Sequence, residues 1–231
     1  MIKTILWDVD GTLLDFDAAE KAAIRALFSE YALGQCTEGM LARYSEINAI
    51  WWQRLERKEI TRKEVLVGRF EQFFEEYGID TRIAAEFNEK YQPRLGETIV
   101  FRDDSPEIIK ALKGNVKQYV VSNGTVVAQT KKLERSKLGE MMDGIFLSER
   151  IGKEKPDPAF FMDVFSQIHT DDLSTVMIVG DSLTSDIQGG MNAGIKTCWY
   201  NPGKKPVPDS YRVDYVISNL HELISILNVE N

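Results

Sequence analysis

The sequence predicts an α/β fold, in which a bundle of helices is inserted into a Rossmann-like parallel sheet core. Short apolar runs alternate with helical patterns from about residue 96 onward, which is typical of a parallel sheet covered on both faces. Residues 17–91 instead carry helical spacing with almost no strand pattern. The one strand before them must join the later strands to bury its apolar side chains. We therefore predict an α/β core of residues 1–15 and 96–231, with a helical insertion at residues 16–95.

The first strand is expected over residues 3–8, where a short apolar run ends at an Asp-Gly turn. Apolar residues then recur at helical spacing over 22–31, 41–51 and 65–77, which predicts three or four helices. Thr61 and Asp80 have side chains that suit N-caps of such helices.

The remainder alternates between the two kinds of element. Ser105 is expected to cap a helix with Pro106 in its first turn, and a second helix follows Thr125 as far as Leu133. The other predicted strands span 118–121, 145–147, 176–179, 196–200 and 214–217, and the other predicted helices span 158–165, 185–193 and 220–227.

Composition narrows the classes of function. The chain has 231 residues, 43% of them hydrophobic, and a net charge of −8, so its surface as a whole is not built for nucleic-acid polymers or anionic membranes. Cys36 and Cys198 lack metal-binding spacing and are expected to be reduced thiols. The N-terminus does not resemble a signal peptide, and no apolar stretch is long enough to span a bilayer. We expect a cytoplasmic protein.

Polar side chains follow the predicted strands at the sheet edge where ligands bind in such folds. Asp8, Asp10 and Thr12 follow the first strand, and Ser122 and Asn123 follow the second. Two neighbouring carboxylates are costly to bury unless a cation or a reacting group uses them.

Two more clusters complete the set. Lys155 precedes Pro156 before a helix, and Asp181 and Asp186 follow the strand at 176–179. A carboxylate can attack phosphorus, a second can protonate the leaving oxygen and activate water, and Mg²⁺ favours oxygen ligands. Ser122 with its neighbouring N–H groups, and the Lys155 ammonium, suit phosphate oxygens. These residues predict phosphoryl-transfer chemistry.

The four clusters, DVDGTL at 8–13, SNG at 122–124, KP at 155–156 and GDSLTSD at 180–186, resemble the motifs of the haloacid dehalogenase-like (HAD) hydrolase superfamily. The resemblance implies that Asp8 is the nucleophile and Asp10 the acid/base. It implies Mg²⁺ held by Asp8, the backbone carbonyl of Asp10, and Asp181. Asp186 would be a ligand through water or an orienter of Lys155.

The resemblance further implies that Thr12, Ser122, Asn123 and Lys155 contact the substrate phosphate, and that residues 16–95 are the superfamily's helical cap. Finer features resemble the pyrimidine 5′-nucleotidase branch, among them LDFDAAE at 14–20 and Gly189-Gly190.

The leading expectation is a Mg²⁺-dependent phosphatase that cleaves small phosphomonoesters, nucleoside 5′-monophosphates first among them, through an aspartyl phosphate. The alternatives are a phosphoglycolate or sugar-phosphate phosphatase, a phosphomutase, and a non-catalytic binding protein on the same fold. Haloacid dehalogenation is disfavoured, because it needs neither the acid Asp10 nor a Mg²⁺ site.

Some polar and aromatic residues are expected to have no role in the site. The basic residues Lys131, Lys132, Arg135 and Lys137 are predicted to form a solvated helical face. Trp51 and Trp52 are expected in the core of the bundle. Phe16 either packs at the hinge or contacts substrate between the catalytic loop and the cap.

Overall fold

A six-stranded parallel sheet forms the centre of the computed structural model, which describes residues 1–227. The order is β3-β2-β1-β4-β5-β6. The strands are β1 (Thr4–Trp7), β2 (Lys117–Ser122), β3 (Gly144–Leu147), β4 (Val176–Gly180), β5 (Lys196–Tyr200) and β6 (Tyr215–Ile217). The predicted fold class is confirmed. The last predicted core residues, 228–231, lie outside the described residues.

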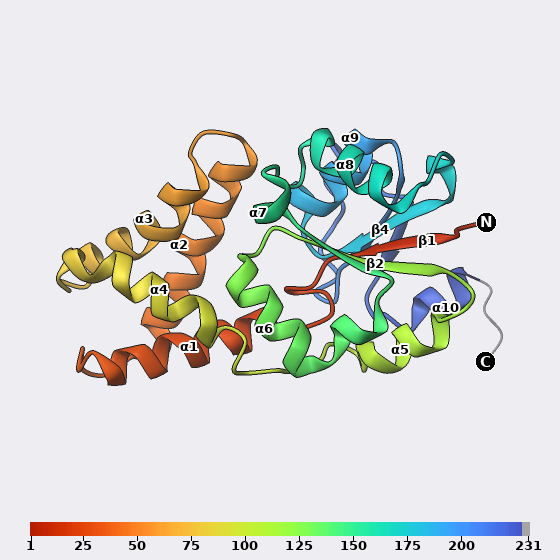
Figure 1. The fold of residues 1–231 in the computed structure, drawn as a ribbon. Helices are drawn as coiled ribbons and strands as arrows, with labels where there is room; N and C mark the ends of the chain where they lie inside the picture. The colour runs from red at the N-terminus through yellow and green to blue at the C-terminus, as the bar shows by residue number, and fades with distance from the viewer. Residues whose placement is uncertain (228–231) are drawn as a thin grey trace.

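Helices cover both faces of the sheet (Figure 1). On one face α8 (Pro158–Ile168) and α9 (Gln188–Ala193) pack with Leu6, Val121 and Ile178 of the strands. On the other, α5 (Ser105–Leu112), α6 (Val126–Ser136) and α10 (Glu222–Ile226) pack with Ile5, Trp7 and Val179. Side chains alternate between the faces along β1, so this central strand is buried completely.

Residues 16–94 form a separate group of helices, called the helical group below, which lies to one side of the sheet in Figure 1. It consists of α1 (Phe16–Glu30), α2 (Glu38–Glu56), α3 (Arg62–Glu76) and α4 (Ala84–Arg94), with a short 3₁₀ turn at Thr81–Ile83. Aromatic rings fill its interior, with Tyr44 stacked on Phe70 at 5.0 Å between centroids.

Capping side chains define the starts of these elements. Thr61 forms a capping box with Glu64 at the start of α3, and the Asp80 carboxylate accepts a bond from the Arg82 N–H. Both predicted N-caps are therefore confirmed. The division of the chain at residues 16 and 95 remains a prediction.

The two segments that join the helical group to the sheet lie side by side. Leu14 bridges Phe101, and the Asp15 N–H donates to the Val100 carbonyl at 2.8 Å. The core also contains the single-turn helix α7 (Ser148–Ile151) and 3₁₀ turns at Leu138–Met141 and Leu173–Thr175. None of the helices within residues 1–227 is both long and apolar enough to cross a membrane.

Two local predictions differ from the structure. Asp104, with φ of 54°, is the N-cap of α5, and the Ser105 hydroxyl donates instead to the Leu13 carbonyl at 2.8 Å. The predicted helix over 185–193 is α9 preceded by a π-helical turn at Leu183–Ile187. In this turn the Asp186 carboxylate accepts from the Ser182 N–H, which fixes Asp186 close to the end of β4.

Candidate active site

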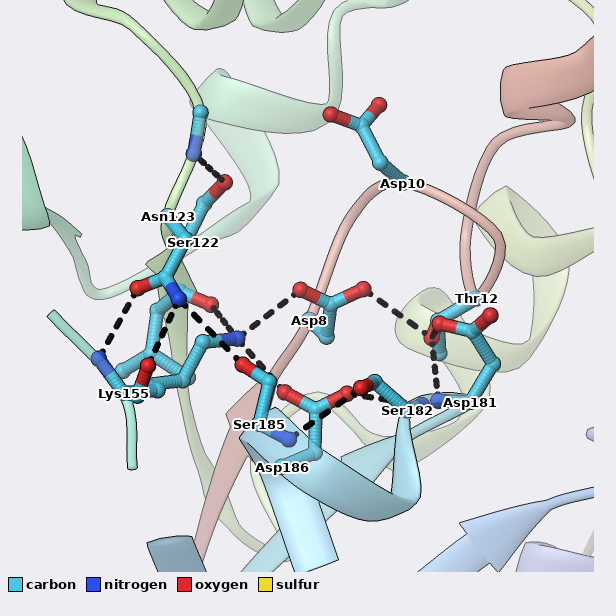
Figure 2. A network of polar contacts seen from close by, with 12 residues as sticks. Asp8, Asp10, Thr12, Ser122, Asn123, Lys155, Asp181, Ser182, Ser185 and Asp186 are labelled. Atoms are coloured by element: carbon cyan, nitrogen blue, oxygen red, sulfur yellow. Dashed lines mark hydrogen bonds and ion pairs between the residues drawn. The ribbon is translucent and has the colours of Figure 1, made fainter. Parts of the chain in front are cut away.

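The carboxyl ends of three adjacent strands bring the predicted residues together (Figure 2). Trp7 at the end of β1 pairs with Val120 of β2 and Val179 of β4. Asp8, Ser122 and Asp181 therefore emerge at the same edge of the sheet, as the parallel arrangement requires.

Asp8 lies at the centre of the polar network. Its side chain is buried, and its Oδ1 accepts from Lys155 Nζ at 2.9 Å while its Oδ2 accepts from Thr12 Oγ1 at 3.1 Å. Burial raises the pKa of Asp8 to about 7, and the nearby Lys155 ammonium opposes that rise. Asp8 thus presents a fixed carboxylate to the space beyond the sheet.

Lys155 is the cation that compensates these acids. It is fully buried, and its Nζ contacts Asp8, the Asp186 carboxylate at 2.6 Å and the Val121 carbonyl at 2.8 Å. Burial alone would lower the pKa of Lys155, but Asp186 and Asp8 raise it above its ordinary value. The Asn123 side chain bonds both the Lys155 N–H and its carbonyl, so Asn123 holds this residue in place.

Three carboxylates converge beside Lys155. Ligand oxygens of Asp8, Asp181 and Asp186 all lie within 4.8 Å of one another. An all-oxygen donor set with excess negative charge fits a hard divalent cation such as Mg²⁺. Of the predicted ligands, Asp8 and Asp181 meet here, and Asp186 joins them.

Thr12 and Ser122 are both buried at this edge. Thr12 Oγ1 donates to Asp8 and accepts from the Asp181 N–H at 3.0 Å, so it connects the loops after β1 and β4. Ser122 Oγ accepts from the Gly124 N–H at 3.0 Å, which leaves its own proton for another acceptor. Their contacts with a substrate phosphate, like that of Asn123, remain predictions.

The Asp10 carboxylate points away from Asp8 (Figure 2). It accepts from Gln129 Nε2 and forms an ion pair with Lys132, both from α6. Lys132 is only 2% exposed, and its Nζ lies 5.0 Å from the centroid of the Phe16 ring. The prediction of a solvated Lys132 was therefore wrong.

The sequence does contain a signal for this arrangement. Gln129 and Lys132 share a helical face with Ala128, Leu133 and Ser136, all of which are buried. Because Gln129 and Lys132 lie on the buried face of α6, the pattern indicates that their side chains are buried against a charged partner. That partner is Asp10, in the turn after β1.

A cavity extends from Asp8, Lys155 and Asp181 to the helical group. Side chains of the helical group on its wall are Phe16, Asn48, Trp52, Glu56, Arg69 and Gln92. Trp52 is half-buried on this wall, so the expectation that it belongs to the bundle core was wrong, whereas Trp51 packs on Gly68. Burial raises the pKa of Glu56 to about 7, and its Oε2 has no partner within the described chain.

The chain is similar to known proteins over most of its length. Residues 5–200 match the family described as haloacid dehalogenase-like hydrolase. The HAD-hydrolase YfnB of Bacillus subtilis is 39% identical, with 99% of this chain and 97% of YfnB covered. The solved structure of YfnB bound to magnesium has a TM-score of 0.91, with 99% of each chain covered.

The relatives whose names state an activity include two pyrimidine 5′-nucleotidases. The pyrimidine 5′-nucleotidase PynA of Streptococcus pneumoniae is 32% identical, with 98% of this chain and 95% of PynA covered. The pyrimidine 5′-nucleotidase YjjG of Escherichia coli is 30% identical, with 96% of each chain covered.

Proposed function

Because the chain belongs to the haloacid dehalogenase-like hydrolase family, we propose that it is a Mg²⁺-dependent phosphatase that cleaves pyrimidine nucleoside 5′-monophosphates. The observation that carries this proposal is the arrangement of buried Asp8, Lys155 and Asp186 with the exposed carboxylate of Asp181 beside them. The names of PynA and YjjG, which match nearly the whole chain, support the substrate class.

In the first step the Asp8 carboxylate attacks phosphorus. An Asp8–phosphorus bond forms as the ester bond breaks, and the leaving oxygen takes a proton from Asp10. Lys155 favours the ionised form of Asp8 and, with Ser122, binds phosphate oxygens. Mg²⁺ at Asp8, Asp181 and the Asp10 carbonyl would neutralise charge on the nucleophile and the phosphate, with Asp186 nearby.

In the second step water attacks phosphorus and the Asp8–phosphorus bond breaks. Asp10, now a carboxylate, takes the proton from that water, so the enzyme returns to its starting state. Asp10 must rotate from Lys132 and Gln129 towards Asp8 for both proton transfers. We propose that the helical group acts as a cap whose closure accompanies this rotation, since Phe16 covers Lys132.

A phosphate-release assay tests the proposal. The panel is UMP, CMP, AMP, ribose 5-phosphate and 2-phosphoglycolate, each with Mg²⁺ and with EDTA. We expect the pyrimidine nucleotides to be the best substrates, activity to disappear in EDTA, and Asp8→Asn to lose roughly 10⁴-fold or more in kcat. Asp163→Asn, an exposed carboxylate on α8, is the matched control. Full activity of Asp8→Asn would refute the mechanism, and preference for another ester would refute the substrate class.

A further inference from the structure

Arg69 of α3 lines the cavity at the end away from the sheet, and it is a buried cation with unused donors. The residue is 2% exposed. Its Nη1 donates to Asn48 Oδ1 at 2.7 Å and its Nη2 to Asn88 Oδ1 at 3.1 Å. Its Nε has no hydrogen-bond partner among residues 1–227. A guanidinium has five N–H donors, so these two bonds leave capacity for a further acceptor.

The charge of Arg69 is also incompletely balanced. Both of its partners are neutral amides, and the carboxylate connected to it is Glu20, which accepts from Asn48 Nδ2 at 2.8 Å. Burial raises the pKa of Glu20 to about 7, so this acid is only partly ionised at neutral pH. A buried cation is costly without a charged or strongly polar partner. The arrangement therefore favours a ligand that brings an electron-rich oxygen.

The remaining walls of the cavity suit a flat ring. Trp52 of α2 lies beside Arg69, with its ring centroid 6.0 Å from the guanidinium carbon. Phe16 of α1 lines the same cavity, as does the amide of Gln92. Aromatic side chains stack on the faces of planar heterocycles, and amide and guanidinium groups form hydrogen bonds with the polar atoms at the ring edges.

We infer that Arg69, oriented by Asn48 and Asn88 and flanked by Trp52, recognises the pyrimidine base by donating to its C2 carbonyl oxygen. This inference rests on the proposed function and adds the residue that selects the substrate. Uracil and cytosine share the C2 carbonyl, whereas adenine has ring nitrogens but no carbonyl. A carboxylate, such as that of 2-phosphoglycolate, offers the same acceptor chemistry without the ring.

The test compares UMP with ribose 5-phosphate, which lacks the base, and with 2-phosphoglycolate, which lacks both base and ribose. We would measure kcat/KM for UMP, ribose 5-phosphate and 2-phosphoglycolate in the wild type and in Arg69→Lys, which keeps the charge but loses the planar fork. The ratio of UMP to ribose 5-phosphate is expected to fall roughly 10- to 100-fold, the range for a lost hydrogen bond to a charged donor. If Arg69 only supported the fold, its replacement would lower kcat/KM equally for UMP and for ribose 5-phosphate and would leave this ratio unchanged.

Neighbouring tryptophans supply a matched pair of variants. Trp52→Leu should lower the same ratio, because Trp52 lines the cavity, and Trp51→Leu should not, because Trp51 packs on Gly68 and bonds Gln72. An unchanged ratio in Arg69→Lys would overturn the inference, and so would a larger loss for 2-phosphoglycolate than for UMP.

A binding measurement separates this inference from the proposed function. The affinities of UMP and ribose 5-phosphate for Asp8→Asn protein with Mg²⁺ are measured by calorimetry, with and without Arg69→Lys. If the wild type turns over none of the esters, the proposed function fails. The inference then stands if UMP binds more tightly than ribose 5-phosphate and Arg69→Lys removes the difference, and it fails otherwise.

Discussion

At the scale of single residues, the site is a balance of buried charges. One buried ammonium, Lys155, contacts two carboxylates, Asp8 and Asp186, while Asp181 adds a third acid nearby. Pairing makes the burial of such charges tolerable, and removal of one partner leaves the others uncompensated. The excess of acid over base is what a divalent cation would correct.

Replacement of Lys155 by Met should therefore destabilise the protein as well as inactivate it. In EDTA we expect a loss of about 3–5 kcal/mol in the free energy of unfolding, measured by urea denaturation. Mg²⁺ should restore part of it by binding the acidic cluster. Lys153→Met, an exposed neighbour, is the control. Equal stability of the Lys155 and Lys153 variants would contradict this account.

Glu20 provides a test by pH. Its pKa of about 7 in the folded protein lies above the ordinary value of 4.5, because the carboxyl is buried. The folded state thus binds the proton more tightly than the unfolded chain, and stability falls as pH rises from about 4.5 to about 7. In Glu20→Gln, the free energy of unfolding should fall by up to about 3 kcal/mol less over this pH range than in the wild type. Parallel pH profiles of unfolding for wild type and variant would contradict the assignment.

At the scale of elements, strands were easier to predict than the orientations of helices. Apolar runs that end at a polar residue or a glycine located all six strands, and the signal is most continuous in β1 and β4, which are buried on both faces. The polar residues after β1, β2 and β4 met as predicted, since parallel strands end at one edge. The orientation of helix α6 was harder to predict. Its Lys132 is buried because it pairs with Asp10, which is far away in sequence.

The remaining differences have similar causes. Trp52 and Trp51 are adjacent on α2, and periodicity alone did not show which faces the cavity and which packs on Gly68. Ser105 bonds the Leu13 carbonyl, a residue far away in sequence, rather than capping its helix. Each case depends on a tertiary partner that local sequence does not identify.

Helix α6 also has a testable role in holding Asp10. Lys132→Met should lower kcat roughly 10- to 100-fold, a part of the usual contribution of acid–base catalysis, because the turn that carries Asp10 loses the ion pair that anchors it to α6 in the resting position from which Asp10 rotates. Lys131→Met is the matched control, since Lys131 pairs with the partly exposed Glu97 instead. Steady-state kinetics with UMP checks the prediction. Equal kcat values for both variants would show that the Asp10–Lys132 pair has no role in turnover.

At the scale of the whole molecule, the proposed function places chemistry and substrate selection in different parts of the chain. The sheet edge provides the charged groups, and the helical group provides the far wall of the cavity. Arg62 of α3 crosses between them, donating to the Asn123 carbonyl at 2.9 Å and to Ser148 Oγ at 2.6 Å. Under the proposed function, Lys155 and a bound Mg²⁺ would meet the substrate phosphate locally, so the net charge of −8 does not exclude an anionic substrate.

Phosphorylation of Asp8 is the step on which the proposed mechanism depends, and peptide mass mapping after a rapid acid quench detects it. With UMP and Mg²⁺, we expect a phosphoryl adduct on the peptide that contains Asp8, and none in EDTA or in Asp8→Asn. Turnover of UMP at an undiminished rate by Asp8→Asn, with no adduct on the wild-type peptide, would contradict it.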